Sequence, residues 1–196
     1  FRSHRSLYPR FVDALVAFAR TARIGDPSRD DTQVGPITTR PQLAKVLGYI
    51  DIAKAEGATL ALGGKRATEA ACGDGWFVEP TIFTDVSPDM RIAQEEVFGP
   101  VIAVIPFDSD EEAIAIANGT IYGLAAGVWT QSIARALTMS QRLRAGTVWV
   151  NTYRAVSYMS PFGGFKRSGI GRESGLSAIR EYLQEKSVWI DISGNV

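Results

Sequence analysis

Two neighbouring carboxylates and an aromatic residue form the part of this sequence with the clearest capacity for chemistry. They lie in residues 95–100, EEVFGP, and an apolar run typical of a buried strand follows at once. An ionised carboxylate such as that of Glu96 can accept two hydroxyl hydrogen bonds, which suits a ribose diol. The ring of Phe98, two residues later, can cover a flat ring. Glu96 and Phe98 are therefore candidate ligand-binding residues, although composition alone favours a solvated acid pair with a core phenylalanine.

A second pair of candidates lies on a predicted helix over residues 41–56. Gln42 and Lys45 are three residues apart in the sequence, so they share one face of that helix. This face could meet a ribose or a phosphate, and the alternative is an exposed polar stripe.

The third group of candidates lies in residues 151–175, a loop whose length is typical of functional or disordered segments. Phe162 is followed by two glycines, which let the backbone turn sharply and approach a ligand closely. Arg154 and Val156 belong to the same loop, and the alternative for Arg154 is a surface ion pair. The glycines of residues 169–175 miss the G-x-G-x-x-G spacing and follow a loop rather than a strand, which excludes a dinucleotide fingerprint.

The sequence offers little material for a nucleophile or a metal site. Cys72 is the one cysteine, and its neighbours include two acids and no cation, unlike the surroundings that activate a thiolate. His4 is the one histidine, too few for a histidine-based metal site. We expect Cys72 to be an incidental cysteine, and we assign no catalytic residue and no metal ligand.

The elements that must position the candidates alternate between helix and strand. Helices are predicted over residues 8–23, 41–56, 110–118, 132–143 and 176–182, and strands over residues 59–62, 101–107, 124–129, 146–150 and 187–192. Alternation of this kind implies parallel strand pairing. The predicted fold is therefore α/β, a three-layer α/β/α arrangement with a mostly parallel sheet.

Composition limits the classes of partner. The chain has 196 residues, 45% of them hydrophobic, which is enough for a well-buried domain. The formal net charge is zero and no long basic run occurs, so we expect no nucleic-acid partner. The longest apolar runs are strand-sized, so we expect no membrane span. A single cysteine fits a reducing compartment, and we expect a cytoplasmic protein.

Residues 95–100 and 160–173 together resemble motifs of the aldehyde dehydrogenase superfamily, and the similarity extends over nearly the whole chain. The resemblance implies a fold like the catalytic domain of that family. It also implies that Glu96 and Phe98 hold the nicotinamide ribose and flank the nicotinamide ring, which reverses the preference drawn from composition.

The same resemblance implies roles for the remaining candidates. Gln42 and Lys45 match a Gln and a Lys that members of the family place near the cofactor. Phe162 matches a Phe in the wall of the aldehyde tunnel, and Val156 stands where some members have another tunnel aromatic, so we expect a wider tunnel. Arg154 is expected near the tunnel mouth, where a guanidinium favours a substrate with an anionic distal group.

The family's catalytic cysteine, general-base Glu, oxyanion-hole Asn and Rossmann-type cofactor domain all lie upstream of the segment that matches residues 1–8. We therefore expect residues 1–182 to be a catalytic-domain fragment, and residues 183–196 to be a C-terminal strand that joins a partner subunit in a homo-oligomer. The complete enzyme is expected to use NAD or NADP to oxidise a small-molecule aldehyde to a carboxylic acid through a cysteine thioester. The fragment alone is expected to be inactive, with no cofactor bound. The alternative is a non-catalytic truncated protein or pseudo-enzyme that acts as an association module.

Overall fold

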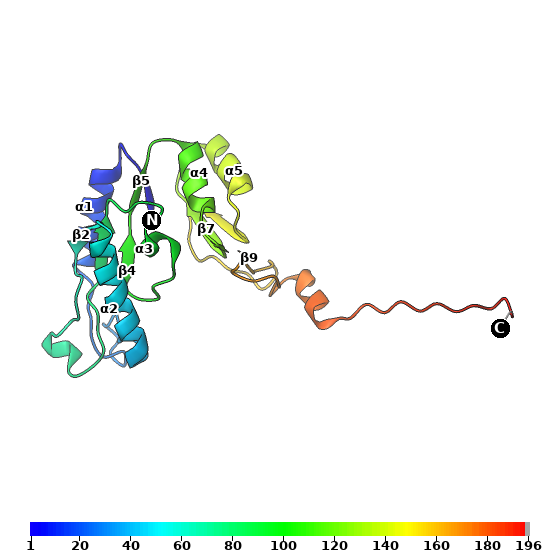
Figure 1. Ribbon diagram of the computed structural model, residues 1–196, viewed down its shortest axis with the longest axis horizontal. Helices are drawn as coiled ribbons and strands as arrows, with labels where there is room; N and C mark the ends of the chain where they lie inside the picture. Colours follow the sequence, from blue (N-terminus) through cyan, green and yellow to red (C-terminus); the bar gives the residue numbers. More distant parts are fainter. Residues whose placement is uncertain (195–196) are drawn as a thin grey trace. The chain divides into compact units, whose positions relative to one another are not determined.

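The computed structural model describes residues 1–194, apart from the side chain of Ala70. The chain forms two compact units, which meet in the sequence between Gly119 and Thr120. Helices and strands are interleaved along both units (Figure 1). The sequence did not signal this boundary. The predicted division at residue 182, which concerns the role of the last residues, stays a prediction.

The first unit carries a three-stranded sheet in the order β2-β3-β4 and a separate pair, β1 with β5. Strand β3 pairs antiparallel with β2 and parallel with β4, and β1 pairs parallel with β5. The elements of this unit are β1 (Arg2–His4), α1 (Tyr8–Ala19), α2 (Arg40–Ala55), β2 (Thr59–Leu62), the 3₁₀ helix η1 (Ala70–Cys72), β3 (Thr81–Thr84), α3 (Arg91–Gln94), β4 (Val101–Ala103), β5 (Ile105–Phe107) and α4 (Asp110–Asn118).

Helix α2 is the element that matters most for the candidate site. Its first turn is fixed by Thr39, whose hydroxyl oxygen accepts the Gln42 main-chain N–H at 3.3 Å. Val46 and Ile50, four residues apart, are buried on one face and pack with Phe83 of β3 in the main hydrophobic cluster. Because Val46 and Ile50 anchor α2 to the core, the backbone of the polar residues beside them on the helix is held in place.

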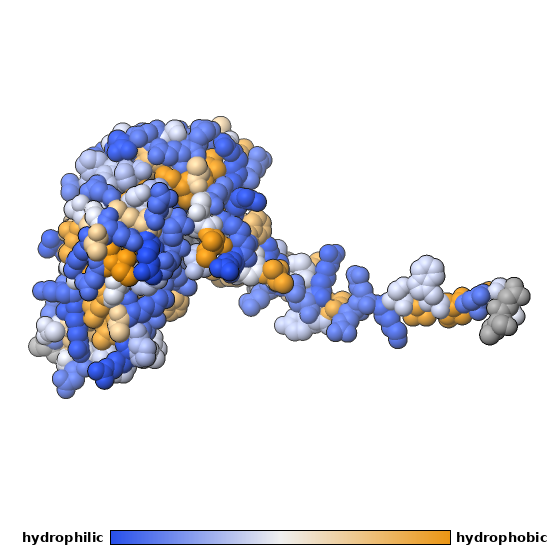
Figure 2. Space-filling model, viewed as in Figure 1, coloured by the Kyte–Doolittle hydropathy of each residue, from blue (hydrophilic) through white to orange (hydrophobic). Residues whose placement is uncertain are grey.

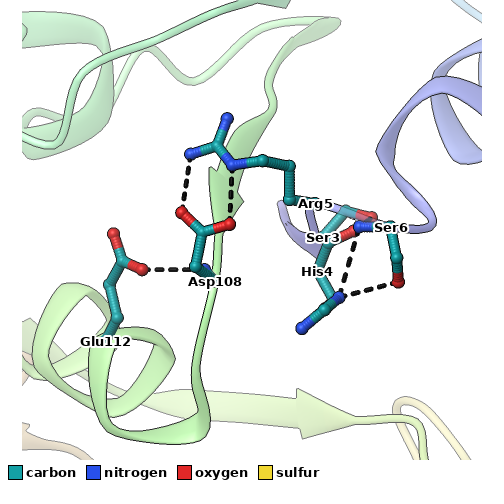
Figure 3. Close-up of polar contacts among 6 residues, drawn as sticks. All are labelled: Ser3, His4, Arg5, Ser6, Asp108 and Glu112. Atoms are coloured by element: carbon teal, nitrogen blue, oxygen red, sulfur yellow. Dashed lines mark hydrogen bonds and ion pairs between the residues drawn. The ribbon is translucent and has the colours of Figure 1, made fainter.

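Past β1 and β5, an ion pair joins Arg5 to Asp108, which lies between β5 and α4 (Figure 3). Arg5 donates two hydrogen bonds to the Asp108 carboxylate, at 2.6 and 2.9 Å. The Asp108 main-chain N–H donates to Glu112 Oε2 at 2.7 Å, and the Glu112 N–H donates to Ser109 Oγ at 3.2 Å. Ser109 is thus the N-cap of α4, and the Glu112 side chain reaches back to the residue before it, so the two bonds together define where α4 begins.

The second unit contains the parallel pair β7 with β8 and the antiparallel pair β6 with β9. Its elements are β6 (Tyr122–Gly123), β7 (Ala125–Val128), α5 (Ile133–Arg142), β8 (Thr147–Val150), β9 (Phe165–Lys166) and the 3₁₀ helix η2 (Leu176–Tyr182). Helix α5 connects β7 to β8 and buries Ala136 and Met139. A strand, a helix and a parallel strand in succession form the βαβ unit that the alternating pattern predicts.

The α/β class predicted from the sequence is confirmed, and parallel pairings outnumber antiparallel ones among the strands of the described residues. The predicted helices are present, with the last one in 3₁₀ form. No helix in residues 1–194 is both long and apolar enough to span a bilayer.

The predicted strand over residues 101–107 is two strands instead of one. The break falls at Val104, which is fully buried and donates its N–H to the Phe83 carbonyl at 2.9 Å. On one side of Val104 the chain pairs with β3, and on the other side it pairs with β1. The break is caused by the change of partner strand at Val104. An apolar run in the sequence does not reveal such a change.

The predicted strand over residues 187–192 is absent from the structure. A strand is defined by hydrogen bonds to a neighbour, and residues 183–194 have no strand beside them within the described chain. Apolar Val188, Ile190 and Ile192 are exposed there. Figure 2 shows hydrophobic and hydrophilic residues interspersed along this terminal segment. The C-terminal segment was predicted to run over residues 183–196, and residues 195 and 196 lie outside the described part of the chain.

Candidate functional site

The motif loop, residues 95–100, lies against one face of α2. Contacts from α2 are made by Gln42, Val46 and Tyr49, which follow one another at intervals of four and three residues. Such spacing places side chains on one helical face. The helical face that carries Gln42, one of the predicted ligand-binding residues, therefore also supports the motif loop.

Glu95, the first residue of the loop, is bound by two protein side chains. Arg91 of α3 donates from Nε to Glu95 Oε1 at 2.7 Å and from Nη2 to Oε2 at 2.9 Å. The phenol of Tyr49 donates a short hydrogen bond to Oε2 of the same carboxylate. The bonds from Arg91 and then from Tyr49 lower the pKa of Glu95 to about 2. We call Tyr49, Arg91 and Glu95 the Glu95 clamp.

Glu96 differs from its neighbour in having no side-chain partner. Its side chain is exposed, and no hydrogen bond or ion pair holds its carboxylate among residues 1–194. The two acids of the pair are thus in different situations, because the Glu95 carboxylate is bonded to protein side chains while the Glu96 carboxylate has no partner among the described residues.

Phe98 occupies an unusual backbone conformation. Its φ is 56°, in the left-handed region, which costs about 1–2 kcal/mol for a residue with a side chain. Its ring is 72% exposed, so burial does not compensate for the strain. The Gln42 side chain donates from Nε2 to the carbonyl oxygens of Val97 and Phe98, at 2.9 and 3.0 Å, and holds this conformation. Strain maintained in this way is typical of functional sites.

Gly99 brings the loop into direct contact with the core of α2. A Cβ at this position would lie 2.7 Å from Val46 Cγ2, closer than real Cβ contacts come. Val46 is fully buried, so it has no room to move aside. A glycine is therefore required for the loop to approach α2 this closely.

Lys45 is exposed on α2 beside the Glu95 clamp. Its ammonium lies 5.8 Å from the centre of the Tyr49 ring, and its charge contributes to the lowered pKa of Glu95. The structure therefore places Gln42, Lys45, Glu96 and Phe98 together around one loop. The predicted cofactor contacts of these four residues stay predictions.

The second unit has a pocket of about 280 Å³ formed within residues 147–174. Val156 and Phe162 both line it, together with Tyr158 and Glu173. Two main-chain hydrogen bonds between Phe162 and Glu173, each 2.7 Å long, close the loop into a narrow antiparallel pair. The structure thus brings together two of the three residues that were predicted to bind the substrate.

Arg154, the third predicted substrate-binding residue, was expected near the tunnel mouth and is not among the residues that line this pocket. It is exposed, with a φ of 60°. The Trp149 indole N–H donates to the Ala155 carbonyl at 2.7 Å, which fixes the chain just after Arg154. Gly163, the first of the two glycines after Phe162, lies close to another stretch of backbone, since a Cβ there would collide with the Gly171 carbonyl oxygen. In this structure the glycine serves packing between backbones.

Cys72 is buried and packs with Ala67 and Phe77 in a small apolar cluster. The only thiol of the sequence is therefore closed off from a substrate in solution. His4 is engaged locally, with Nδ1 lying 2.8 Å from Ser6 Oγ (Figure 3). No cluster of metal-binding side chains occurs in the described part of the chain.

Comparison with known proteins identifies the class. The sequence model of the aldehyde dehydrogenase family matches residues 3–188, and the chain belongs to this family. A betaine aldehyde dehydrogenase of Brucella anthropi is 50% identical over 189 residues. The match covers 96% of this chain and 39% of that protein, so the chain spans about two fifths of the curated relative.

Solved structures of the family agree with the fold. An NAD⁺ complex of an aldehyde dehydrogenase from Bacillus cereus is 50% identical and superposes with a TM-score of 0.90, covering 97% of this chain and 38% of that one. A betaine aldehyde dehydrogenase from Staphylococcus aureus in complex with NAD⁺ is 42% identical, with a TM-score of 0.90, covering 92% of this chain and 36% of that one.

Sequence reasoning missed the Glu95 clamp. Tyr49 lies seven residues after Gln42 and Arg91 lies four residues before Glu95, so both spacings were available as signals. The i, i+4 pair of Arg91 and Glu95 could have been found from the sequence alone. The bond from Tyr49 could not, because it depends on how α2 and α3 pack.

Proposed function

We propose that this chain is part of an NAD-dependent aldehyde dehydrogenase, in which the motif loop binds the nicotinamide end of the cofactor. The observation that carries the proposal is the conformation of the loop, which presents the Glu96 carboxylate and the Phe98 ring to solvent at a cost in backbone strain. Membership of the aldehyde dehydrogenase family and NAD⁺ complexes of related enzymes support NAD as the cofactor.

The residues present fit a nicotinamide ribose. Glu96 has acceptor oxygens that no described side chain occupies, which suits the two hydroxyls of a ribose. Phe98 offers an exposed ring to stack beside a planar group. Lys45 adds a cation on the same side of α2, which suits a nearby phosphate or ribose. When bound, NAD⁺ supplies the acceptor for the hydride that leaves the substrate carbon.

The nucleophile must come from outside residues 1–196, because Cys72 is buried. In the proposed reaction a cysteine thiolate adds to the aldehyde carbon, hydride loss gives a thioester, and water hydrolyses the thioester to a carboxylic acid and the free thiol. The part played by this chain is to orient the nicotinamide through Glu96 and Phe98. It also lines the approach of the aldehyde through Val156 and Phe162.

A small aldehyde with a cationic group is the substrate that we propose to test first. Relatives that match the chain are betaine aldehyde dehydrogenases. The pocket lining supports this choice, because Tyr158 and Phe162 provide aromatic rings and Glu173 provides a carboxylate. Aromatic faces and carboxylates attract quaternary ammonium groups. Arg154, outside the pocket lining, gives no support for an anionic substrate.

The proposal is tested by following NADH absorbance with two proteins, the full-length enzyme that contains this sequence and the 196-residue polypeptide alone. With NAD⁺ and betaine aldehyde we expect turnover by the full-length enzyme and none by the polypeptide. Hexanal and succinic semialdehyde serve as neutral and anionic comparison substrates. Saturable NADH formation by the polypeptide that survives Cys72→Ser would overturn the proposal that the nucleophile lies outside residues 1–196.

The role of Glu96 gives a more specific test. Glu96→Gln in the full-length enzyme should slow the pre-steady-state burst of NADH by about tenfold, because an amide replaces a charged acceptor of the ribose hydroxyls. The matched control is Glu69→Gln, the same change at an exposed position outside the motif loop. If the burst rate and the affinity for NAD⁺ both equal those of the unmodified enzyme, Glu96 is only a surface acid.

A further inference from the structure

We infer that the Glu95 clamp is a positioning device, which keeps Glu96 and Phe98 directed toward the nicotinamide end of the cofactor. This inference rests on the proposed function and goes beyond it. It gives a role to the first glutamate of the pair and to Tyr49 and Arg91, which bind one another rather than a ligand.

The clamp joins two helices through one carboxylate. Arg91 belongs to α3 and Tyr49 to α2, and both donate to Glu95 at the point where α3 ends. The Arg91 guanidinium also lies 5.3 Å from the centre of the Tyr49 ring, so the three side chains form one compact group. A bidentate arginine–carboxylate pair fixes the orientation of the carboxylate as well as its position.

A second anchor lies on the other side of Glu96. The Gln42 side chain holds the carbonyl oxygens of Val97 and Phe98, and Val97 itself is buried. Glu96 is thus the residue between two fixed points, of which one is the clamp and the other is the amide of Gln42. With both neighbours held, the backbone at Glu96 has little freedom, so its side chain leaves the loop from a fixed point.

Charge gives the clamp a second effect. Arg91 neutralises Glu95, so the negative charge that the loop presents comes from Glu96. If Glu95 loses its charge, the Arg91 guanidinium loses its carboxylate partner and can turn to another carboxylate. Two are available, Glu56, whose Oε2 already accepts the Arg91 main-chain N–H at 2.8 Å, and Glu96, five residues further along the chain. Pairing of Arg91 with Glu96 would draw that carboxylate away from the ribose hydroxyls. Loss of Glu95 should therefore harm cofactor binding more than loss of the Tyr49 hydroxyl.

The test uses the full-length enzyme with the variants Glu95→Gln, Tyr49→Phe and the double variant Glu95→Gln/Arg91→Met. Three quantities are measured for each, namely the rate of the NADH burst, the dissociation constant for NAD⁺, and the rate of amide hydrogen exchange in a peptide that spans the motif loop. The matched control is Glu79→Gln, which removes the carboxylate of a 3.7 Å ion pair with Lys65, a pair that does not involve the motif loop.

We expect Glu95→Gln to slow the burst on the order of tenfold and to speed exchange in the loop, because a small misplacement of a positioning group costs this much or more. Tyr49→Phe should have a weaker effect in the same direction. The double variant should recover part of the burst rate, because the competing guanidinium is gone, while exchange in the loop stays fast. Glu79→Gln should change none of the three quantities.

A burst rate and NAD⁺ affinity for Glu95→Gln within twofold of the unmodified enzyme would overturn the inference. So would a slow burst with unchanged exchange in the loop, since the effect would then not be positional. If Glu95→Gln fails to fold, Tyr49→Phe, which removes one hydroxyl, decides. Unchanged amide exchange in the motif loop of that variant would then overturn the inference. If the unmodified enzyme makes no NADH from any aldehyde, the proposed function fails. The exchange rates then still show whether the clamp holds the loop.

Discussion

At the scale of single residues, Phe98 has a backbone conformation that lowers the stability of the fold. Its backbone is strained and its ring is mostly exposed, so the folded chain gains little from having a phenylalanine there. A residue that costs stability and contributes little to packing is best explained by what its ring does for a bound molecule.

Phe98→Gly should stabilise the protein or leave its stability unchanged, and should weaken NAD⁺ binding. Glycine removes the strain of the positive φ, about 1 kcal/mol, and gives up little burial. The matched control is Phe18→Gly, because Phe18 is 75% exposed but lies in α1. There the same change should destabilise by about 0.5–1 kcal/mol. Urea unfolding of both variants checks the opposite signs, and equal losses at the two sites would contradict the strain argument.

Which residues of the site could be predicted depends on how local their contacts are. Glu96 and Phe98 were predicted as residues directed toward a ligand, and their exposure agrees with this expectation. Gln42 was predicted near a ribose or a phosphate, which stays a prediction, and its amide nitrogen is bonded to two loop carbonyls, a contact that the sequence did not indicate. The sequence cannot distinguish these cases, because both need a polar side chain on the same helical face. Arg154 was placed by its position in a loop, and loop position says little about the direction of a long side chain.

At the scale of elements, the site consists of a loop supported by one helix. The motif loop touches α2 through a charged contact, an amide contact and a close apolar contact. The apolar contact at Gly99 sets the distance between them. Helix α2 was predicted from the sequence, whereas its contact with the loop depends on a packing distance that a sequence pattern does not contain.

Gly99→Ala should destabilise the protein by about 1–3 kcal/mol, because the added methyl overlaps the buried side chain of Val46. The matched control lies in the same helix, where a Cβ on Gly48 would meet nothing within 4 Å. Gly48→Ala should stabilise by about 0.5–1 kcal/mol, as expected for alanine in a helix interior. Val46→Ala combined with Gly99→Ala should lose less than the sum of the single losses. Strict additivity in a double-mutant cycle would show that the two residues do not touch.

The Glu95 clamp should also make the free energy of unfolding depend on pH in the acid range. The folded-state pKa of Glu95 lies at about 2, below its ordinary value of 4.5. The contribution of Glu95 to stability is therefore fully present above about pH 5, and is lost as the pH falls toward 2. The free energies of unfolding of the unmodified protein and of Glu95→Gln should differ by a constant amount near neutrality and converge in acid. High salt should narrow the difference, since the pair is exposed. A difference that is independent of pH would argue against an ionic clamp.

At the scale of the whole molecule, the terminal segment is the largest departure from what the sequence indicated. Residues 187–192 have the composition of a strand, but a strand needs a neighbour to bond with, and the described chain supplies none. Trp189 and Ile190 are exposed. Exposed apolar residues in extended chain favour addition to the sheet edge of another molecule. We therefore propose that this segment mediates self-association.

Removal of residues 187–196 should lower the association state of the protein, as measured by sedimentation velocity across a concentration series. The unmodified protein is expected to form dimers or larger species through this segment. The double substitution Val188→Thr/Ile190→Thr, which keeps β propensity but removes apolar surface, should weaken association in the same direction. A protein that is monomeric at high micromolar concentration with the segment intact would refute the role in association.

The ion pair between Arg5 and Asp108 bears on how the protein is made. Its partners are 103 residues apart in the chain, and so are the strands β1 and β5 that flank it. On a ribosome that adds about 5–20 residues per second, β1 emerges about 5–20 s before β5 exists to pair with it. During that interval the edge of β1 is open to wrong partners. Chaperone binding during synthesis of residues 5–104 should therefore affect the yield of soluble protein. Slowed translation across the same residues should change this yield more than equally slowed translation after residue 108.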